Sequence, residues 1–278
     1  MRKRFFIAPP ALRMAAFFLR EYFFPFGCSV CGAGLVGAEE SWRGLCAGCR
    51  AELEAWLEES AAAPACARCG RPLVSEREIC LSCRAGEGRG EVLPDRSVAL
   101  FPYAGRYRAA LAAYKFGKNL ALGNFFAEKA LAALEGGALS PGAGFGAEAC
   151  VVPVPPRPGK LRETGWDQVE YLARAFERQA GKTGGWKVSR CLRRLPSESQ
   201  KALGLEGRRA NLRGRIVPSR RAPETAIVLD DVMTTGSTLA ACASALREAG
   251  AKTVYGLCLF YSAESTGAAE PRGSQRDR

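Results

Sequence analysis

Cysteine spacing is the feature that most restricts how this chain can fold. Eight of its 12 cysteines form four C-x-x-C pairs within 56 residues. Four thiolates complete one tetrahedral shell, which is the coordination that zinc takes in structural sites. Pairing in sequence order predicts two shells, made of Cys28, Cys31, Cys46, Cys49 and of Cys66, Cys69, Cys80, Cys83. An interleaved pairing is the alternative.

A ribbon of this size buries too little apolar surface to fold alone, so we expect zinc to stabilise it. Four protein ligands leave no open position, which favours a structural role for both ions. Residues 28–90 hold seven Arg and nine Glu, and this balance argues against a phosphate-binding ribbon. Zinc-bound thiolates are typical of a reducing compartment, and we expect a cytoplasmic protein. The other cysteines are expected in the core: Cys150, Cys191, Cys242 and Cys258.

Residues 1–27 are rich in aromatic side chains and carry a net charge of +4. Pro9, Pro10 and Arg13 interrupt the apolar run, so we expect neither a signal peptide nor a transmembrane segment. A short helix packed on the rest of the chain is the simpler expectation. A contact with a membrane surface or a partner is the alternative.

The chain contains no histidine, which excludes every mechanism that needs an imidazole. Its net charge of +12 is uneven, because residues 186–221 alone hold 11 Lys or Arg against two Glu. That stretch must face solvent or an anionic partner.

Beyond a linker at Arg84–Asp95, apolar strand-like runs alternate with helical stretches, which predicts an α/β fold with a parallel sheet and helices on its faces. We expect strands at 97–103, 149–155, 226–230 and 252–261, and helices at 108–116, 121–134, 167–181 and 237–250. The predicted units are an aromatic-rich segment at 1–27, a double zinc ribbon at 28–90, the α/β domain at 91–263 and a disordered tail at 264–278.

The stretch Ile227–Leu239 reads IVLDDVMTTGSTL and joins a buried strand to a helix. Asp230 and Asp231 follow the strand, where two adjacent carboxylates need sugar hydroxyls or a cation to compensate them. The hydroxyl-rich residues after them stand at a helix N-terminus, which favours a phosphate; they are Thr234, Thr235, Gly236, Ser237 and Thr238. A simple helix cap with a surface Asp pair is the alternative, but it explains only one of the four hydroxyls.

This turn resembles the signature of the type I phosphoribosyltransferases. Further motifs are similar to the ComF/GntX family, the late-competence phosphoribosyltransferase-like proteins: the cysteine ribbon, YKF at 114–116, VVPVP at 151–155, GWDQ at 165–168, and Gln200, Leu203, Arg208, Asn211 and Gly214. The similarity runs from about Phe24 to Tyr261. Where that family has R-G-F-N-Q, this chain has Thr164 to Gln168, which loses a cation and gains a carboxylate; Arg157, Lys160 and Arg162 are candidates to replace the cation.

The resemblance implies a type I phosphoribosyltransferase fold that binds phosphoribosyl pyrophosphate with Mg²⁺. Asp230 and Asp231 would bind the ribose hydroxyls, and Thr234 to Thr238 the 5'-phosphate. The strand exit at Val154 would form the pyrophosphate loop, although a plain proline-stiffened strand end is the alternative. Lys115, Arg157 and Arg162 would neutralise the leaving pyrophosphate.

The family's role implies DNA uptake, with single-stranded DNA and the competence helicase machinery as partners. Two functions follow. The chain is either a phosphoribosyltransferase for an unspecified acceptor, or a non-catalytic adaptor that binds single-stranded DNA in response to phosphoribosyl pyrophosphate. The basic residues 186–221 fit a substrate lid or a DNA surface, but Trp186 is the only stacking ring among them.

Overall fold

The computed structural model describes residues 27–73, 77–88, 92–139, 145, 149–183, 185–196 and 214–262. The predictions for residues 1–26 and for the tail 264–278 lie outside this part of the chain. So do Gln200, Leu203, Arg208 and Asn211 of the family pattern, whereas Gly214 lies within it. Among the described helices, none is both long and apolar enough to cross a membrane.

The centre of the molecule is a five-stranded parallel sheet with the order β1-β7-β6-β2-β3. Its strands are β1 (Arg96–Pro102), β2 (Cys150–Pro153), β3 (Lys187–Val188), β6 (Thr225–Met233) and β7 (Thr253–Tyr261). A separate antiparallel pair is formed by β4 (Leu192–Arg194) and β5 (Ile216–Pro218). The parallel sheet with flanking helices confirms the expected α/β architecture.

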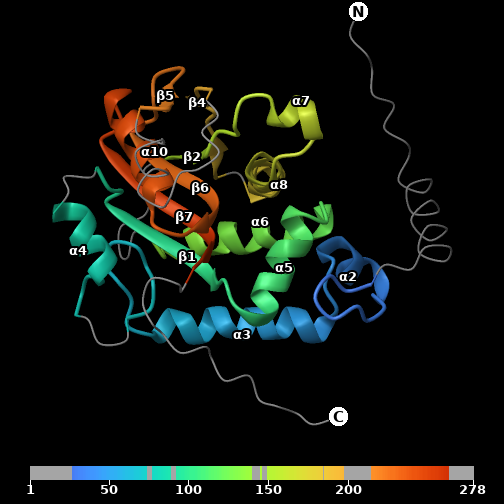
Figure 1. Cartoon of the computed structure of the whole chain (residues 1–278). Helices are drawn as coiled ribbons and strands as arrows, with labels where there is room; N and C mark the ends of the chain where they lie inside the picture. Colours follow the sequence, from blue (N-terminus) through green and yellow to red (C-terminus); the bar gives the residue numbers. More distant parts are fainter. Residues whose placement is uncertain are drawn as a thin grey trace, which may run out of the picture.

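Helices connect the strands and cover both faces of the sheet (Figure 1). The helices α5 (Gly105–Lys115), α6 (Leu120–Glu135) and α8 (Gln168–Thr183) share one face, while α10 (Ser237–Glu248) lies on the other with β4 and β5. A short helix, α7 (Lys160–Thr164), follows β2. Each predicted helix is present with ends shifted by a few residues.

The core is divided by the sheet because neighbouring strand residues point to opposite faces. Ile227 and Leu229 of β6 join the cluster that contains Phe101, Phe125 and Phe126. Ala226 and Val228 of the same strand join the cluster under α10, whose fully buried members include Cys242 and Leu246. Strands buried on both faces read as continuous apolar runs, which explains the sequence IVL before the aspartates.

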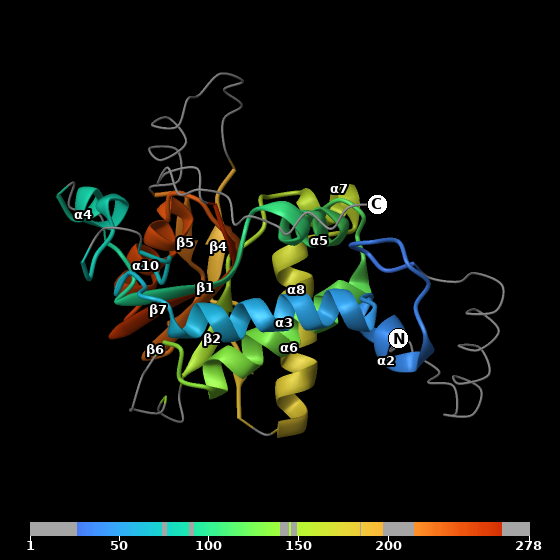
Figure 2. The same cartoon turned by 90° about the horizontal axis from the view of Figure 1, so that it is seen from below.

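The cysteine-rich part contains three helices: α2 (Gly37–Arg43), α3 (Ala47–Ala62) and α4 (Leu81–Gly88). Figures 1 and 2 show α2 and α4 at opposite ends of α3. The two cysteine quartets are therefore separated by a long helix rather than stacked as one ribbon. The predicted linker Arg84–Asp95 begins inside α4, and β1 follows it at Arg96.

The order of the strands defines where a ligand can sit. Strand β2 continues through α7 and α8 to β3, away from β6, whereas β6 continues through α10 to β7, away from β2. Neighbouring strands whose connections leave in opposite directions create a topological switch point, and ligands of open α/β sheets bind at its carboxyl edge. The turn after β6 lies at this edge.

Candidate functional site

Each cysteine quartet forms a compact cluster in the sequential pairing that the spacing predicted. In both quartets the sulfur atoms lie within 4.8 Å of one another. The Sγ atoms of Cys31 and Cys46 are 3.7 Å apart, as are those of Cys69 and Cys80. A tetrahedron with zinc–sulfur bonds of about 2.3 Å requires sulfurs about 3.8 Å apart. Both quartets therefore fit a zinc ion.

The electrostatics of these thiols also suit a divalent cation. Burial opposes ionisation of Cys28, but backbone N–H groups that include that of Cys46 lower its pKa to about 6. In the second quartet, neighbouring sulfurs and burial raise the pKa of Cys83 strongly, first through Cys66. Four adjacent thiols cannot all ionise without a cation, so zinc binding must release protons.

The two aspartates of the turn are buried inside β6. The strand continues past them to Met233, because β7 pairs with it up to Tyr261; the strand end expected at Asp230 was therefore too early. Asp230 and Asp231 are only 7% and 6% exposed. Burial, and then the neighbouring Asp231, raise the pKa of Asp230 well above its usual range. A buried carboxyl whose pKa is raised in this way marks a candidate functional site.

Asp231 lies in a network of polar side chains from three elements. Its Oδ2 is 3.1 Å from Lys115 Nζ on α5 and accepts a hydrogen bond of 2.9 Å from Gln168 Nε2 at the start of α8. Tyr114, beside Lys115, donates its hydroxyl to the Gln168 carbonyl at 2.6 Å. The YKF and GWDQ motifs therefore meet at the acidic turn.

The carboxylate that this chain carries at Asp167 has a local role. Its Oδ1 caps α8 by accepting from the N–H groups of Val169 and Glu170, at 3.0 and 2.9 Å. Lys160 Nζ lies 2.7 Å from Asp167 Oδ2 and donates to Gln168 Oε1 at 2.6 Å. Lys160 thus neutralises the extra carboxylate and orients Gln168.

The hydroxyl-rich turn precedes α10, whose N-cap is Gly236 at φ +77°. Thr234 is exposed, and Thr235 to Thr238 are half-buried. The Thr235 and Ser237 hydroxyls are 2.6 Å apart, and Thr235 Oγ1 accepts from the Ser237 N–H at 3.4 Å. The first N–H groups of a helix attract anions, so the turn is suited to a phosphate.

The loop after β2 carries the remaining predicted residues. Val154 is buried, and its N–H donates to the Leu229 carbonyl at 3.0 Å, so this N–H is committed to the sheet. Arg157 is exposed and pairs with Glu163 at 2.7 Å. Arg157 and Arg162 line a cavity of about 320 Å³ together with Arg193 and Arg194 of β4. Four arginines at one cavity favour an anionic occupant.

Sequence reasoning did not identify four of these contributors as site residues. Gln168 belonged to a noted motif, and its position after a helix cap was the available signal. Arg193 and Arg194 stood in the basic stretch without a distinguishing pattern. Arg71 follows the second C-x-x-C pair, is 5% exposed, and donates to the carbonyls of Met233 and Thr234. Its contact joins positions 162 residues apart, and no sequence pattern indicated it.

The arrangement can hold a molecule with a diol and a phosphate. Asp230 and Asp231 are adjacent carboxylates of the kind that could take part in holding a cation. Among the described residues, the cysteine quartets are the only groups with three or more clustered metal ligands.

A comparison with protein-family models matches residues 19–84 to the double zinc ribbon domain. The matched range contains both cysteine quartets and ends inside α4. A search of curated proteins finds no match. The chain therefore carries a double zinc ribbon domain whose two four-cysteine sites are consistent with two structural zinc ions.

Proposed function

We propose that this chain is a phosphoribosyltransferase-like protein of the ComF/GntX type that binds phosphoribosyl pyrophosphate with Mg²⁺ and acts in DNA uptake in the cytoplasm. Residues 91–263 would form the ligand-binding unit, and residues 28–90 the zinc ribbon beside it. The supporting observation is a convergence at the topological switch point: two buried carboxylates, Lys115 and a helix N-terminus occupy the same edge of the sheet.

The electrostatics of the turn support a polar ligand rather than an apolar one. Lys115 and Gln168 partly compensate Asp231, whereas the carboxylate of Asp230 accepts the Asp231 N–H at 2.9 Å. Ribose hydroxyls would donate hydrogen bonds to both carboxylates and so reduce the cost of burying them. The 5'-phosphate would lie on the N–H and hydroxyl groups of Thr235 and Ser237.

In transfer of the phosphoribosyl group, the electron pair of an acceptor nucleophile forms a bond to the anomeric carbon, the bond from that carbon to pyrophosphate breaks, and the departing oxygen takes its electron pair. Mg²⁺ bound with the pyrophosphate would supply positive charge to this leaving group. Among the protein groups, Lys115 is placed at the carboxylate edge, and Arg157 and Arg162 lie on the adjoining loop. Their charges would stabilise the departing anion without a protein nucleophile.

Calorimetric titration tests the ligand before any acceptor is chosen. Wild-type protein should bind phosphoribosyl pyrophosphate in the presence of Mg²⁺, and Asp231→Asn should weaken binding by about ten- to a hundredfold, because a charged acceptor is lost. Glu224→Gln is a matched control, since Glu224 is exposed, pairs with Lys252 and precedes the opposite end of β6. Absence of binding by the wild type would overturn the proposal.

The basic cavity favours a second candidate function, an adaptor that binds single-stranded DNA and responds to phosphoribosyl pyrophosphate. Nucleic-acid binding through Arg193 and Arg194 should fall steeply with salt and be lost on charge reversal of both residues. Lys252→Glu changes an exposed charge at the opposite edge and serves as the control. Fluorescence anisotropy with a labelled oligonucleotide measures the effect, and unchanged affinity in the double variant would exclude this surface.

A further inference from the structure

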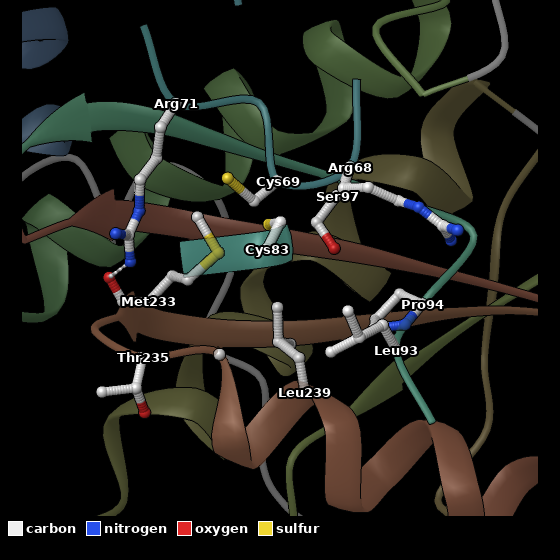
Figure 3. A pocket seen from close by; sticks show the side chains of 11 residues that line it. Arg68, Cys69, Arg71, Cys83, Leu93, Pro94, Ser97, Met233, Thr235 and Leu239 are labelled. Atoms are coloured by element: carbon white, nitrogen blue, oxygen red, sulfur yellow. Dashed lines mark hydrogen bonds between the residues drawn. The ribbon is translucent and has the colours of Figure 1, made fainter. Parts of the chain in front are cut away.

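The second cysteine quartet lies across a small cavity from the hydroxyl-rich turn, whereas the first quartet packs elsewhere. Figure 3 shows Cys69 and Cys83 on one side of a cavity of about 40 Å³ that Met233, Thr235 and Leu239 border from the other side. In the first quartet, Ser29 accepts a hydrogen bond from Asn119 at 2.7 Å, which places that ribbon at the start of α6.

Arg71 is the residue that joins the second ribbon to the turn. Its main chain belongs to the zinc knuckle: the carbonyl accepts from the Cys66 N–H at 2.8 Å, and the N–H bonds to the Cys69 sulfur. Its buried guanidinium reaches out of the ribbon and donates through Nη2 to the Met233 carbonyl oxygen at 3.4 Å (Figure 3). The same Nη2 donates to the Thr234 carbonyl oxygen. One side chain therefore connects two structures that are remote in sequence.

The direction of these hydrogen bonds determines the direction of the peptide N–H groups. In a planar trans peptide the C=O and the N–H point to opposite sides. The Met233 carbonyl shares its peptide with the Thr234 N–H, and the Thr234 carbonyl shares its peptide with the Thr235 N–H. The Met233 carbonyl also accepts from the Ser262 N–H at 3.0 Å, so β7 already fixes the peptide that contains the Thr234 N–H. The guanidinium fixes the Thr234 carbonyl on the ribbon side, and the Thr235 N–H is therefore directed away from the ribbon.

We propose that Arg71 is a positioning residue that presents the Thr235 N–H group to the phosphate of the ligand, and that zinc in the second quartet holds Arg71 in place. This inference rests on the proposed function for the identity of the ligand. It assigns the two zinc sites different roles, since only the second one supports the turn. By thermodynamic linkage, occupancy of the turn should in return stabilise zinc in the second quartet.

The packing of the ribbon against the sheet keeps this geometry rigid. The Ser97 N–H of β1 donates to the Arg68 carbonyl at 2.6 Å. Gly70, at φ +68°, lies so close to β1 that an added Cβ would be 2.7 Å from the Ser97 carbonyl oxygen. The main chain on both sides of Cys69 is therefore fixed to the sheet, and Arg71 starts from a fixed position.

The test compares full-length Arg71→Met, Arg71→Lys and Arg84→Met. Methionine replaces the aliphatic stem of arginine and carries no donor, and lysine keeps a donor that can satisfy one carbonyl at a time. Arg84 is a matched control, because it belongs to the same ribbon but donates to the Arg77 carbonyl within it. Native mass spectrometry first establishes that each variant holds two zinc ions.

Hydrogen exchange of the peptide 231–238 is measured without ligand, and affinity for phosphoribosyl pyrophosphate with Mg²⁺ is measured by calorimetry. We expect faster exchange of this peptide and about ten- to a hundredfold weaker binding in Arg71→Met, partial recovery in Arg71→Lys, and wild-type behaviour in Arg84→Met. Wild-type exchange and affinity in Arg71→Met would overturn the inference.

Zinc dependence provides a second arm that does not require Arg71 variants to fold. Cys83→Ser should accelerate exchange in 231–238, and Cys31→Ser in the first quartet should leave it unchanged; equal effects of the two would contradict separate roles. If wild-type protein binds no phosphoribosyl pyrophosphate, the proposed function fails, and the exchange measurements still decide whether Arg71 orders the turn.

Discussion

Replacement of Asp230 by asparagine should stabilise the ligand-free protein while it abolishes ligand binding. Asp230 is 7% exposed and stands beside a second buried carboxylate, and its pKa is raised by burial and by Asp231. Asparagine has nearly the same shape, and its oxygen can still accept the Asp231 N–H that lies 2.9 Å from Asp230 Oδ1. The change therefore removes an unfavourable charge without leaving the N–H unpaired.

The magnitude follows from the charges around the site. Carboxylates of adjacent residues on the order of 5 Å apart repel by about 3 kcal/mol at an effective dielectric constant of about 20. Lys115, 3.1 Å from Asp231, offsets part of this repulsion, but its side chain is 33% exposed and solvent screens it. We expect a net gain of about 1–2 kcal/mol, which corresponds to a rise in Tm of about 2–8 °C.

The difference in stability between Asp230→Asn and wild type should depend on pH. A carboxyl with a raised folded pKa binds its proton more tightly in the folded protein, so wild-type stability falls as pH rises above the usual value of 3.8 and levels off above the folded pKa. Asparagine does not titrate. The stability difference should therefore vanish below about pH 4 and grow toward neutral pH.

Thermal unfolding from pH 4 to pH 8, followed by circular dichroism without ligand, measures the effect. Glu224→Gln removes a charge of the same sign from an exposed site and should leave Tm nearly unchanged. A Tm of Asp230→Asn equal to or below that of wild type at pH 8, or a difference independent of pH, would refute the electrostatic explanation.

Three further predictions concern the ribbons and the core. Plasma mass spectrometry should find two zinc ions per wild-type chain and one in Cys31→Ser or Cys83→Ser, with loss of metal at low pH as the thiols bind protons; full retention would exclude those ligands. Gly70→Ala should lower the free energy of unfolding, measured with denaturant, by about 2–4 kcal/mol, because Gly70 has a positive φ and lies against β1. Gly32 also has a positive φ but lies in open space, so Gly32→Ala should lower the free energy of unfolding by about 1 kcal/mol. Equal losses in the two variants would argue against the contact of Gly70 with β1. Phe126→Ala, fully buried against Phe101 and Phe260, should cost about 3–5 kcal/mol by the same measurement, and a loss under about 1 kcal/mol would contradict its place in the core.

Local patterns predicted the main elements because strands and helices of this fold have distinct apolar periods. The predicted strand 226–230 failed only at its end, since two aspartates look like a strand exit while β7 keeps them in the sheet up to Met233. The helix α3 was not expected, because the cysteine spacing predicts only a ribbon in this region. Its sequence Ala47–Ala62 is nevertheless rich in Ala, Glu and Leu, which favour a helix.

The site could be predicted only in part, because its contacts depend on tertiary structure. The aspartates and hydroxyls lie on one continuous turn, and their chemistry is visible in the sequence. Gln168 and Arg71 reach the turn from positions 63 and 162 residues away from their bonding partners. A local sequence pattern does not indicate which helix N-terminus or which ribbon loop will lie at the carboxyl edge of the folded sheet.

The two ribbons pack against opposite faces of the parallel sheet. The first ribbon contributes Leu45 and Leu53 to the cluster that contains α6 and α8, and the second contributes Cys66 and Cys80 to the cluster under α10. Each ribbon therefore extends the core on a different face. The second also bonds to β1, an edge strand of the parallel sheet whose unpaired groups would otherwise be open to other chains. Loss of zinc from the second quartet should consequently weaken both the sheet edge and the acidic turn, whereas loss from the first quartet should weaken the packing at the start of α6.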